Sequence, residues 1–362
     1  METTYRIHPA IGIARLGNST RPDGWFLGPE APGQVPDGPF KDGPGSIKRQ
    51  GARFRIYEYQ DGKPVREIDN RVAQIIWKVH LVNSKAAGRV IIGGSELRNQ
   101  HLQGADRARL ILDSGAQPIS SLDSGPVRLQ GHFLGCCVPL GDLRTDGQGR
   151  LIVLGGFGHS FSPSGKELQG TFNNDDWCDD SADGPVTATI HFADRSVRAE
   201  PAWVVVGPPD YAAPVDNASS LYDVIYQAGY EQLKLHHDPL LAQNEVSFTR
   251  HVYPLLQRTV ATYGVIGVSS GETGHEPQQN GNFLQPDLFA RLKDNNPDPG
   301  KPPYQARDAV FGWLRDPAGG GGSMPKLAMS PSLEPWKYEV MKRWRDGKFA
   351  ADWPGKPPSG HL

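Results

Sequence analysis

Short runs of alternating apolar and polar residues fill the first part of the chain, to about residue 215. Residues 53–59 place Phe54 and Ile56 on one side and Arg53 and Arg55 on the other, a period of two that is typical of a half-buried strand. The strands predicted from such runs are 6–15, 53–59, 73–82, 89–92, 131–142, 150–154, 186–192 and 202–206. Turn sequences between them favour an antiparallel sandwich or an open barrel.

Beyond about residue 215 the spacing of apolar residues becomes helical. Helices are predicted over 219–235, from Ser247 through Leu256, over 304–315 and over 336–346, where Gly347 marks the end of the last one. Pro254 conflicts with the first turn of the second helix. Residues 319–323 form a glycine-rich linker or loop. The predicted fold class is α+β, with a β-rich sandwich-like domain over 1–215 and a mainly helical region over 216–362.

Composition and charge narrow the class of protein. Glycine (43) and proline (32) supply about a fifth of the 362 residues, against roughly 12% in an average protein. That content argues against a helical bundle or a coiled coil. The 38 basic and 40 acidic residues nearly balance, which gives no electrostatic reason to expect nucleic acid or an anionic membrane as a partner.

Targeting and redox features are sparse. The N-terminus lacks the basic and apolar regions of a signal peptide, so a cytoplasmic location is expected. Three cysteines, of which Cys136 and Cys137 are adjacent, do not indicate a disulfide framework. Cys136 and Cys137 are predicted to lie in the core of a strand. Cys178, beside Asp179, is predicted to have a raised thiol pKa.

The acidic segment 173–184 is the densest candidate for cation chemistry. Asp179, Ser181, Asp183 and Gly184 match the first half of a calcium-binding loop. The glutamate that closes such a loop would fall at Ile190, within a predicted strand, so the EF-hand interpretation is excluded. A solvated turn whose aspartates cap backbone groups, or an occasional calcium site, are the two alternatives that stay open.

The histidines and glycine-rich loops offer weaker candidates. His236, His237 and Asp238 lie near a predicted helix end, where a structural role is favoured over metal binding because adjacent side chains on a helix diverge. His8, before Pro9, is expected to be a hydrogen-bonded structural residue. The loops 93–95 and 155–160 place glycines where backbone N–H groups face an anion, but neither completes a nucleotide-binding motif.

Five parts of the chain together carry a resemblance to one known family. They are 8–19, 143–146 followed by 149–156, 179–186, 247–258, and Met324–Pro325 with the Trp-x-x-Gly-x-Phe pattern of 344–349. These segments resemble the LodA-like quinoprotein amino-acid oxidases, which include L-lysine 6-oxidase and glycine oxidase. They occur in the family's order and extend over nearly the whole chain.

The resemblance implies an oxidase that uses cysteine tryptophylquinone, formed from a tryptophan and a cysteine of the same chain. In that family an amine substrate forms a Schiff base with the quinone and a carboxylate removes a carbon-bound proton. Hydrolysis then yields an aldehyde or oxo acid, and oxygen reoxidises the cofactor to give hydrogen peroxide. The family also implies an amino-acid substrate, a flavoprotein partner for maturation and, for some members, non-classical export.

The family's cofactor-forming residues lie downstream of the Trp344–Phe349 segment. The resemblance therefore assigns no catalytic, cofactor-binding or metal-binding residue to any position of this sequence. Trp177 and Cys178 are adjacent and would form a strained crosslink, while Cys136 or Cys137 with a distant tryptophan stays open. We expect the N-terminal portion of an oxidase, inactive alone and without the quinone. The alternative is a non-enzymatic binding or assembly module for a partner chain, and an oligomer stays open.

Overall fold

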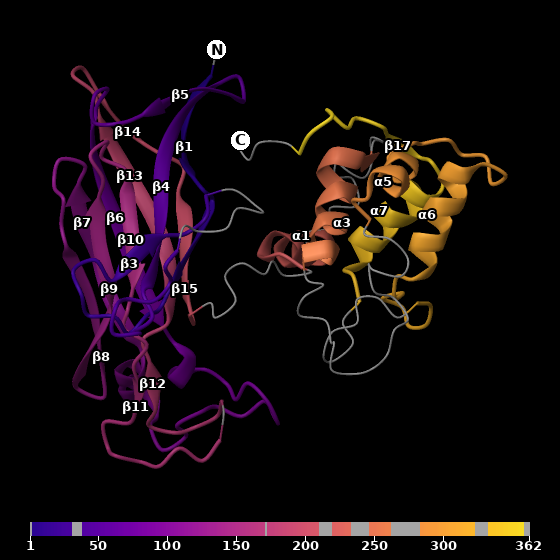
Figure 1. Ribbon diagram of the computed structural model, residues 1–362. Helices are drawn as coiled ribbons and strands as arrows, with labels where there is room; N and C mark the ends of the chain where they lie inside the picture. Colours follow the sequence, from indigo (N-terminus) through magenta and orange to yellow (C-terminus); the bar gives the residue numbers. More distant parts are fainter. Residues whose placement is uncertain are drawn as a thin grey trace. The chain divides into compact units, whose positions relative to one another are not determined.

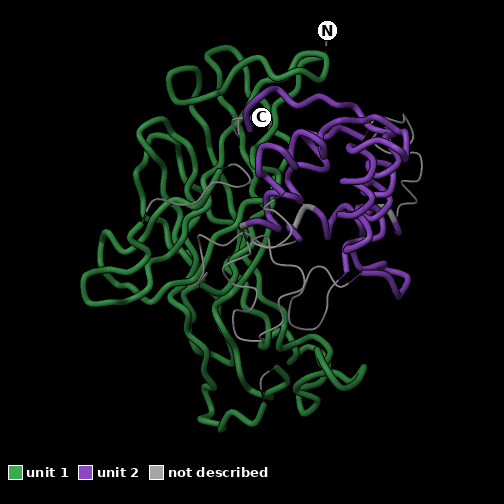
Figure 2. Tube along the Cα trace, turned by 45° about the vertical axis from the view of Figure 1, so that its right-hand side comes forward, with its two compact units in different colours: residues 1–211 green, residues 212–362 purple. Residues whose placement is uncertain are grey.

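The computed structural model describes residues 2–30, 38–170, 172–209, 219–232, 246–261, 283–322 and 332–357. The chain forms two compact units, residues 1–211 and residues 212–362, shown in separate colours in Figure 2. The domain boundary predicted near residue 215 lies outside the described residues. Within the described residues, no helix has both the length and the apolar character that crossing a membrane requires.

Unit 1 is a strongly curved sheet (Figure 1). Its hydrogen-bonded path runs β7-β6-β13-β15-β2-β4-β10-β9-β8, and β1, β3, β5 and β14 pair beside this path. The strands at the two ends of the path, β7 and β8, contact each other, so the sheet is nearly closed into a barrel. The strands are β1 Thr3–His8, β2 Ile11–Arg15, β3 Trp25–Leu27, β4 Arg49–Gln60, β5 Lys63–Ile68, β6 Gln74–Asn83, β7 Leu112–Ser120, β8 Val127–Phe133, β9 Cys136–Thr145, β10 Leu151–Gly155, β13 Ala182–His191, β14 Ser196–Arg198 and β15 Ala202–Gly207.

The prediction that unit 1 is rich in β-strands is confirmed. The predicted sandwich matches the nearly closed sheet only roughly. Most neighbouring strands are antiparallel, but β15 runs parallel to β2 and β3 runs parallel to β4. Alternation places Ile75, Trp77 and Val79 of β6 inside, each at most 1% exposed. Burying a side chain of this size contributes about 1.5–3 kcal/mol. The interior of the curved sheet is therefore the core of unit 1.

The strand predictions differ from the structure in four places. The predicted strand 6–15 is two strands, β1 and β2, because the chain bends at Pro9 and Ala10 between them. Residues 89–92 form no strand: Arg89 makes only an isolated bridge with Leu97, and Ile92 is 62% exposed. Residues 131–142 are not one strand, because a turn at Leu134 and Gly135, both with positive φ, separates β8 from β9. Strand β7 was missed since its glycine and proline interrupt the apolar pattern.

Unit 2 is mainly helical, as predicted (Figure 1). The Pro254 conflict is resolved by a π-helical turn, η4, after which α3 begins at Tyr253 with the proline in its first turn. The helix α5 was not predicted. The elements are α1 Leu221–Gln232, β16 Val246–Ser247, η4 Phe248–Val252, α3 Tyr253–Ala261, α5 Pro286–Leu292, α6 Pro302–Gly312, α7 Pro335–Arg345 and β17 Phe349–Ala350.

A buried ion cluster joins α1, α3 and α7. The carboxylate of Asp223, which is 3% exposed, lies 2.5 Å from Lys337 Nζ and accepts a hydrogen bond of 2.9 Å from Arg258 Nη1. Burial favours the neutral form of Asp223, but the hydrogen bond and charge of Lys337 outweigh it and hold its pKa below the usual value. The backbone N–H and the hydroxyl of Ser220 also donate to it. Asp223 thus compensates two buried cations.

Replacing this carboxylate by its uncharged isostere, Asp223→Asn, removes the charge that Arg258 and Lys337 share and leaves Lys337 only the more distant Glu334, at 3.8 Å. We expect a loss of about 3–5 kcal/mol in the free energy of unfolding of unit 2. Hydrogen exchange of amides in α1 and α7 measures this loss directly. The matched control is Asp298→Asn, an exposed position where the amide oxygen can still accept the hydrogen bond from the Gly300 N–H. Equal losses in the two variants would contradict the importance of the cluster.

Candidate functional site

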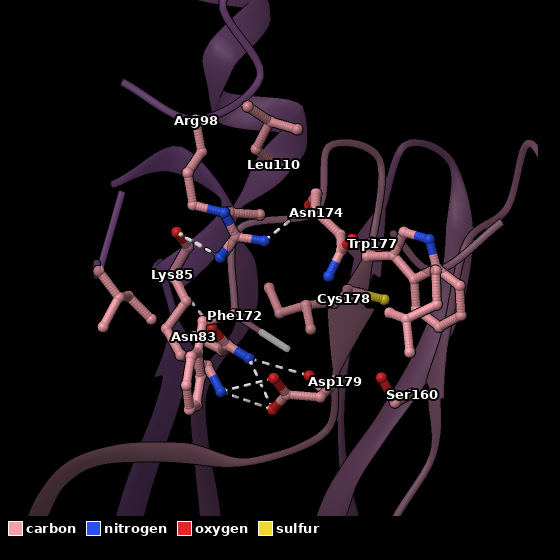
Figure 3. Close-up of a pocket in the computed structure, with 14 residues that line it drawn as sticks. Asn83, Lys85, Arg98, Leu110, Ser160, Phe172, Asn174, Trp177, Cys178 and Asp179 are labelled. Atoms are coloured by element: carbon pink, nitrogen blue, oxygen red, sulfur yellow. Dashed lines mark hydrogen bonds and ion pairs between the residues drawn. The ribbon is translucent and has the colours of Figure 1, made fainter. Parts of the chain in front are cut away.

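The candidate site is a cavity of about 140 Å³ at one end of unit 1, named here the loop-end cavity (Figure 3). The elements around it are the end of β6, the 3-10 helices η1 Lys85–Ala87 and η2 Gly104–Leu110, and the short pair β11 Ser160–Phe161 and β12 Cys178–Asp179. Two loops that are far apart in the sequence therefore meet here. The lining residues are Asn83, Lys85, Ala86, Ile91, Arg98, Leu110, Leu112, Ser160, Leu168, Phe172, Asn174, Trp177, Cys178 and Asp179.

An ion pair lies at one side of the cavity. Lys85 Nζ donates to Asp179 Oδ1 at 2.7 Å (Figure 3). It also donates to Ser181 Oγ at 2.7 Å. Asp179 Oδ1 also accepts the backbone N–H of Ser181 at 2.9 Å, which is the capping role that one of the two sequence alternatives described. Asp183 lies on β13 and accepts from Trp203 Nε1 at 2.9 Å. The two aspartates of the calcium-like pattern are therefore held by different partners.

Arg98 and Asn99 connect the two loops. Arg98 Nη1 donates to the Lys85 carbonyl at 3.2 Å and Nη2 donates to the Asn174 carbonyl at 2.8 Å. Asn99, fully buried with a φ of 52°, donates its backbone N–H to Asp175 Oδ1 at 2.7 Å. The Asn99 side-chain oxygen accepts the N–H of Asp176 at 2.6 Å. Sequence reasoning missed both residues.

The glycine-rich loop at 155–160 encloses an internal carboxylate. Asp180 is 1% exposed, and its Oδ2 accepts the N–H of Gly158 at 2.9 Å. A Cβ on Gly156 would lie 2.4 Å from this oxygen, so the loop needs glycine there. Burial raises the pKa of Asp180, and the backbone N–H groups of the loop partly oppose that rise. The chain's own carboxylate thus occupies the place that the glycine pattern suggests for an external anion.

Comparison with known proteins identifies the family. A family model described as L-lysine epsilon oxidase N-terminal matches residues 8–206. The chain is 33% identical over 322 residues to the L-lysine 6-oxidase of Marinomonas mediterranea, an alignment that covers 73% of this chain and 43% of that protein. This chain belongs to the LodA-like family.

Solved structures show the same fold. The epsilon-lysine oxidase structure from Marinomonas mediterranea matches with a TM-score of 0.74 and 24% identity. The Schiff base intermediate of that L-Lys epsilon-oxidase with L-Lys matches with a TM-score of 0.72 and 23% identity. Both matches cover 98% of this chain and 63% of the other chain. The chain thus spans less than two thirds of the length of these LodA-like relatives.

The LodA-like segments of unit 2 are structural. Phe248 and Trp344 are fully buried, and the indole of Trp344 donates to the Leu292 carbonyl at 2.9 Å. Gly347 has a φ of 75°, and a Cβ there would lie 2.5 Å from the Asn295 carbonyl oxygen. Strands β16 and β17 pair in parallel and bring segment 247–258 beside segment 344–349. Met324–Pro325 lies outside the described residues.

The structure tests the prediction for His8 but not the one for His236 and His237. His8 Nε2 lies 2.8 Å from the Tyr59 hydroxyl, which confirms its hydrogen-bonded structural role. Burial, followed by the charge of Arg6, lowers the pKa of His8. His236, His237 and Asp238 lie outside the described residues. Within the part of the chain that the structure describes, no group of three His, Cys, Asp or Glu side chains is placed to hold a metal ion.

The cysteines correct one prediction and support another. Cys136 and Cys137 are exposed rather than part of the core, because they directly follow the β8–β9 turn and only from Val138 onward does β9 bury its alternate residues. Cys178 is buried, and desolvation, reinforced by Asp179, raises its pKa to about 12. The predicted direction was right, but burial rather than the acidic neighbour is the main cause.

These residues do not fit the quinone that the family implies. Cys178 is held as a neutral thiol, and its neighbour Trp177 donates its indole N–H to the Lys166 carbonyl at 3.1 Å. Neighbouring side chains in extended backbone point to opposite sides, so a thioether between these two would distort the chain. Cys136 and Cys137 are exposed at a hairpin turn, away from the water-excluded surroundings that such a cofactor needs. We therefore assign no catalytic step to a Cys–Trp pair here.

Thiol reactivity tests the cysteine assignment. At pH 8 we expect iodoacetamide to alkylate Cys136 and Cys137, while Cys178 stays unmodified because its thiolate is scarce and buried. Peptide mass spectrometry locates the label. Cys178 should react only after unfolding in guanidinium, which provides the control. Rapid labelling of Cys178 in the folded protein would contradict the assignment.

A double-mutant cycle tests the internal carboxylate. Gly156→Ala places a methyl group against Asp180, so we expect a loss of about 1–3 kcal/mol in the free energy of unfolding of unit 1. In an Asp180→Ala background the same methyl group no longer meets the carboxylate, and only the Pro139 carbonyl oxygen, 2.9 Å away, still crowds it, so it should cost less. Denaturant unfolding of the four proteins measures the coupling. Additive losses would show that the two residues do not interact.

Proposed function

We propose that this chain serves an amino-acid oxidase of the L-lysine epsilon-oxidase type, which converts a primary amine, oxygen and water to an aldehyde or oxo acid, ammonia and hydrogen peroxide. The observation that carries the proposal is the family match over residues 8–206. The 33% identity to an L-lysine 6-oxidase supports lysine as the substrate class. A matched structure is described as a Schiff base intermediate with L-Lys, which requires an electrophilic carbonyl of the kind a quinone supplies.

Within such an oxidase, we assign this chain a scaffolding role. Its three cysteines are exposed at a turn or buried as a neutral thiol, which argues against cysteine tryptophylquinone forming from them. The chain also spans 43% of the length of the L-lysine 6-oxidase that it resembles. The proposal is that the 362 residues alone do not oxidise lysine and that the quinone is formed by residues outside them.

The alternative is a binding or assembly module for a partner chain. Helix α1 favours it, because Val224 is 54% exposed and Ile225 is 44% exposed on one turn of an amphipathic helix. Such a module would act without any redox chemistry of its own. The scaffolding role and the assembly module predict different results when the remaining part of a LodA-like oxidase is added. Oxidase activity is expected for the scaffolding role but not for the assembly module.

The test uses the purified 362-residue chain. We expect an intact mass equal to that of the sequence, no quinone staining on a denaturing gel and no peroxide from L-lysine or glycine. Addition of the remaining part of a LodA-like oxidase, co-expressed with its flavoprotein, should give a complex that releases peroxide from an amino acid. Complex formation without activity would favour the assembly module. A mass above that of the sequence, from oxygen added to a tryptophan, would overturn the scaffolding role.

A further inference from the structure

Arg98 carries a buried charge without a counter-ion. Its side chain forms part of the wall of the loop-end cavity (Figure 3), and the residue is 7% exposed. Both of its hydrogen bonds go to neutral backbone carbonyls, those of Lys85 and Asn174. Its Nε has no acceptor, and among the described residues no carboxylate lies within ion-pair distance of it. A buried cation without a counter-ion attracts an anion that can compensate its charge.

The other polar groups of the cavity are already compensated. Lys85 is neutralised by Asp179, and Asn83 Nδ2 donates to the Asp179 carbonyl at 2.9 Å. The Cys178 thiol is neutral, because burial raises its pKa to about 12. Arg98 is therefore the one lining residue, among those described, whose charge is left unbalanced. The electrostatics of the cavity select for a single negative charge.

Part of the wall is apolar. Leu110 and Leu112 are each 1% exposed, whereas Ile91, Leu168 and Phe172 are 57%, 62% and 50% exposed. Exposed large apolar side chains gathered around one cavity are typical of a ligand-binding surface. The volume of about 140 Å³ is close to the roughly 150 Å³ of an engineered cavity that holds benzene. A ring or a short aliphatic chain therefore matches its size.

We propose that the loop-end cavity binds a small monocarboxylate with an apolar tail. The guanidinium of Arg98 supplies the charge that attracts the carboxylate, and the tail lies against Ile91, Leu168 and Phe172. A planar carboxylate suits a guanidinium better than a point charge does, and the apolar wall disfavours a fully hydrated inorganic anion. This site is independent of the proposed oxidase function, because it uses no quinone and no redox step.

Calorimetric titration of the full chain tests the charge requirement. The probes are benzoate and hexanoate. Benzamide is the neutral analogue of benzoate, acetate is a carboxylate without an apolar tail, and inorganic phosphate is an anion without any apolar group. We expect benzoate and hexanoate to bind at least about tenfold more tightly than benzamide, acetate or phosphate. The variant Arg98→Gln should lose at least about tenfold in benzoate affinity. The control Arg128→Gln, at an exposed position of β8, should retain full affinity.

A second variant keeps the proposal testable if Arg98→Gln does not fold. Leu168→Ser changes an exposed residue, and we expect it to weaken hexanoate several-fold while the weak binding of acetate stays the same. Equal binding of benzoate and benzamide, equal binding of phosphate and hexanoate, or no binding of any carboxylate would overturn the proposal. A peptide ending in a leucine carboxylate distinguishes the source: binding of that peptide but of no free acid would overturn the small-molecule ligand in favour of a polypeptide terminus.

Discussion

Strand β4 is the constraint on which the rest of unit 1 depends. Its first half hydrogen bonds with β2, β3 and β10, and its second half pairs with β1 and β5. A strand that pairs with two sets of neighbouring strands must be long, and it must have small side chains where side chains of its partners pack closely against it. Gly51 and Ala52 lie opposite Leu154 and Val153 of β10. Phe54, further along, is fully buried in the core. Strand β4 therefore joins the two sets of strands into one sheet.

The loops at the end of unit 1 are held by polar groups rather than by a second apolar core. Arg98, Asn99 and Asp180 are nearly inaccessible, and each binds backbone groups of a segment remote from its own. A buried polar group without a hydrogen-bond partner lowers the stability of the fold. Each of these hydrogen bonds therefore holds its loop in one position. Unit 2 uses the same device in the Asp223 cluster. In both units, polar side chains fix segments that packing alone would leave undetermined.

The sequence was a good guide where local pattern and burial agree. The alternation at 73–82 predicts β6 almost to the residue, and the spacing at 336–346 predicts α7. The sequence pattern failed where burial depends on a distant partner. Ile91 and Ile92 form an apolar run but are exposed, because among the described residues no strand pairs with them. The candidate site was hardest to predict, since Asn99 and Asp175 are 76 positions apart and neither belongs to a motif.

The Asp180 carboxylate has a consequence for how such loops diversify. A loop whose backbone N–H groups, including that of Gly158, hold the chain's own carboxylate resembles an anion receptor with a tethered occupant. The receptor and the occupant come from different segments, so each can vary separately in evolution. Replacing Asp180 by a residue with a shorter side chain would free the backbone N–H groups of the loop while the loop itself stays unchanged. A latent anion site of this kind can therefore persist in a fold, unused, until a single substitution uncovers it.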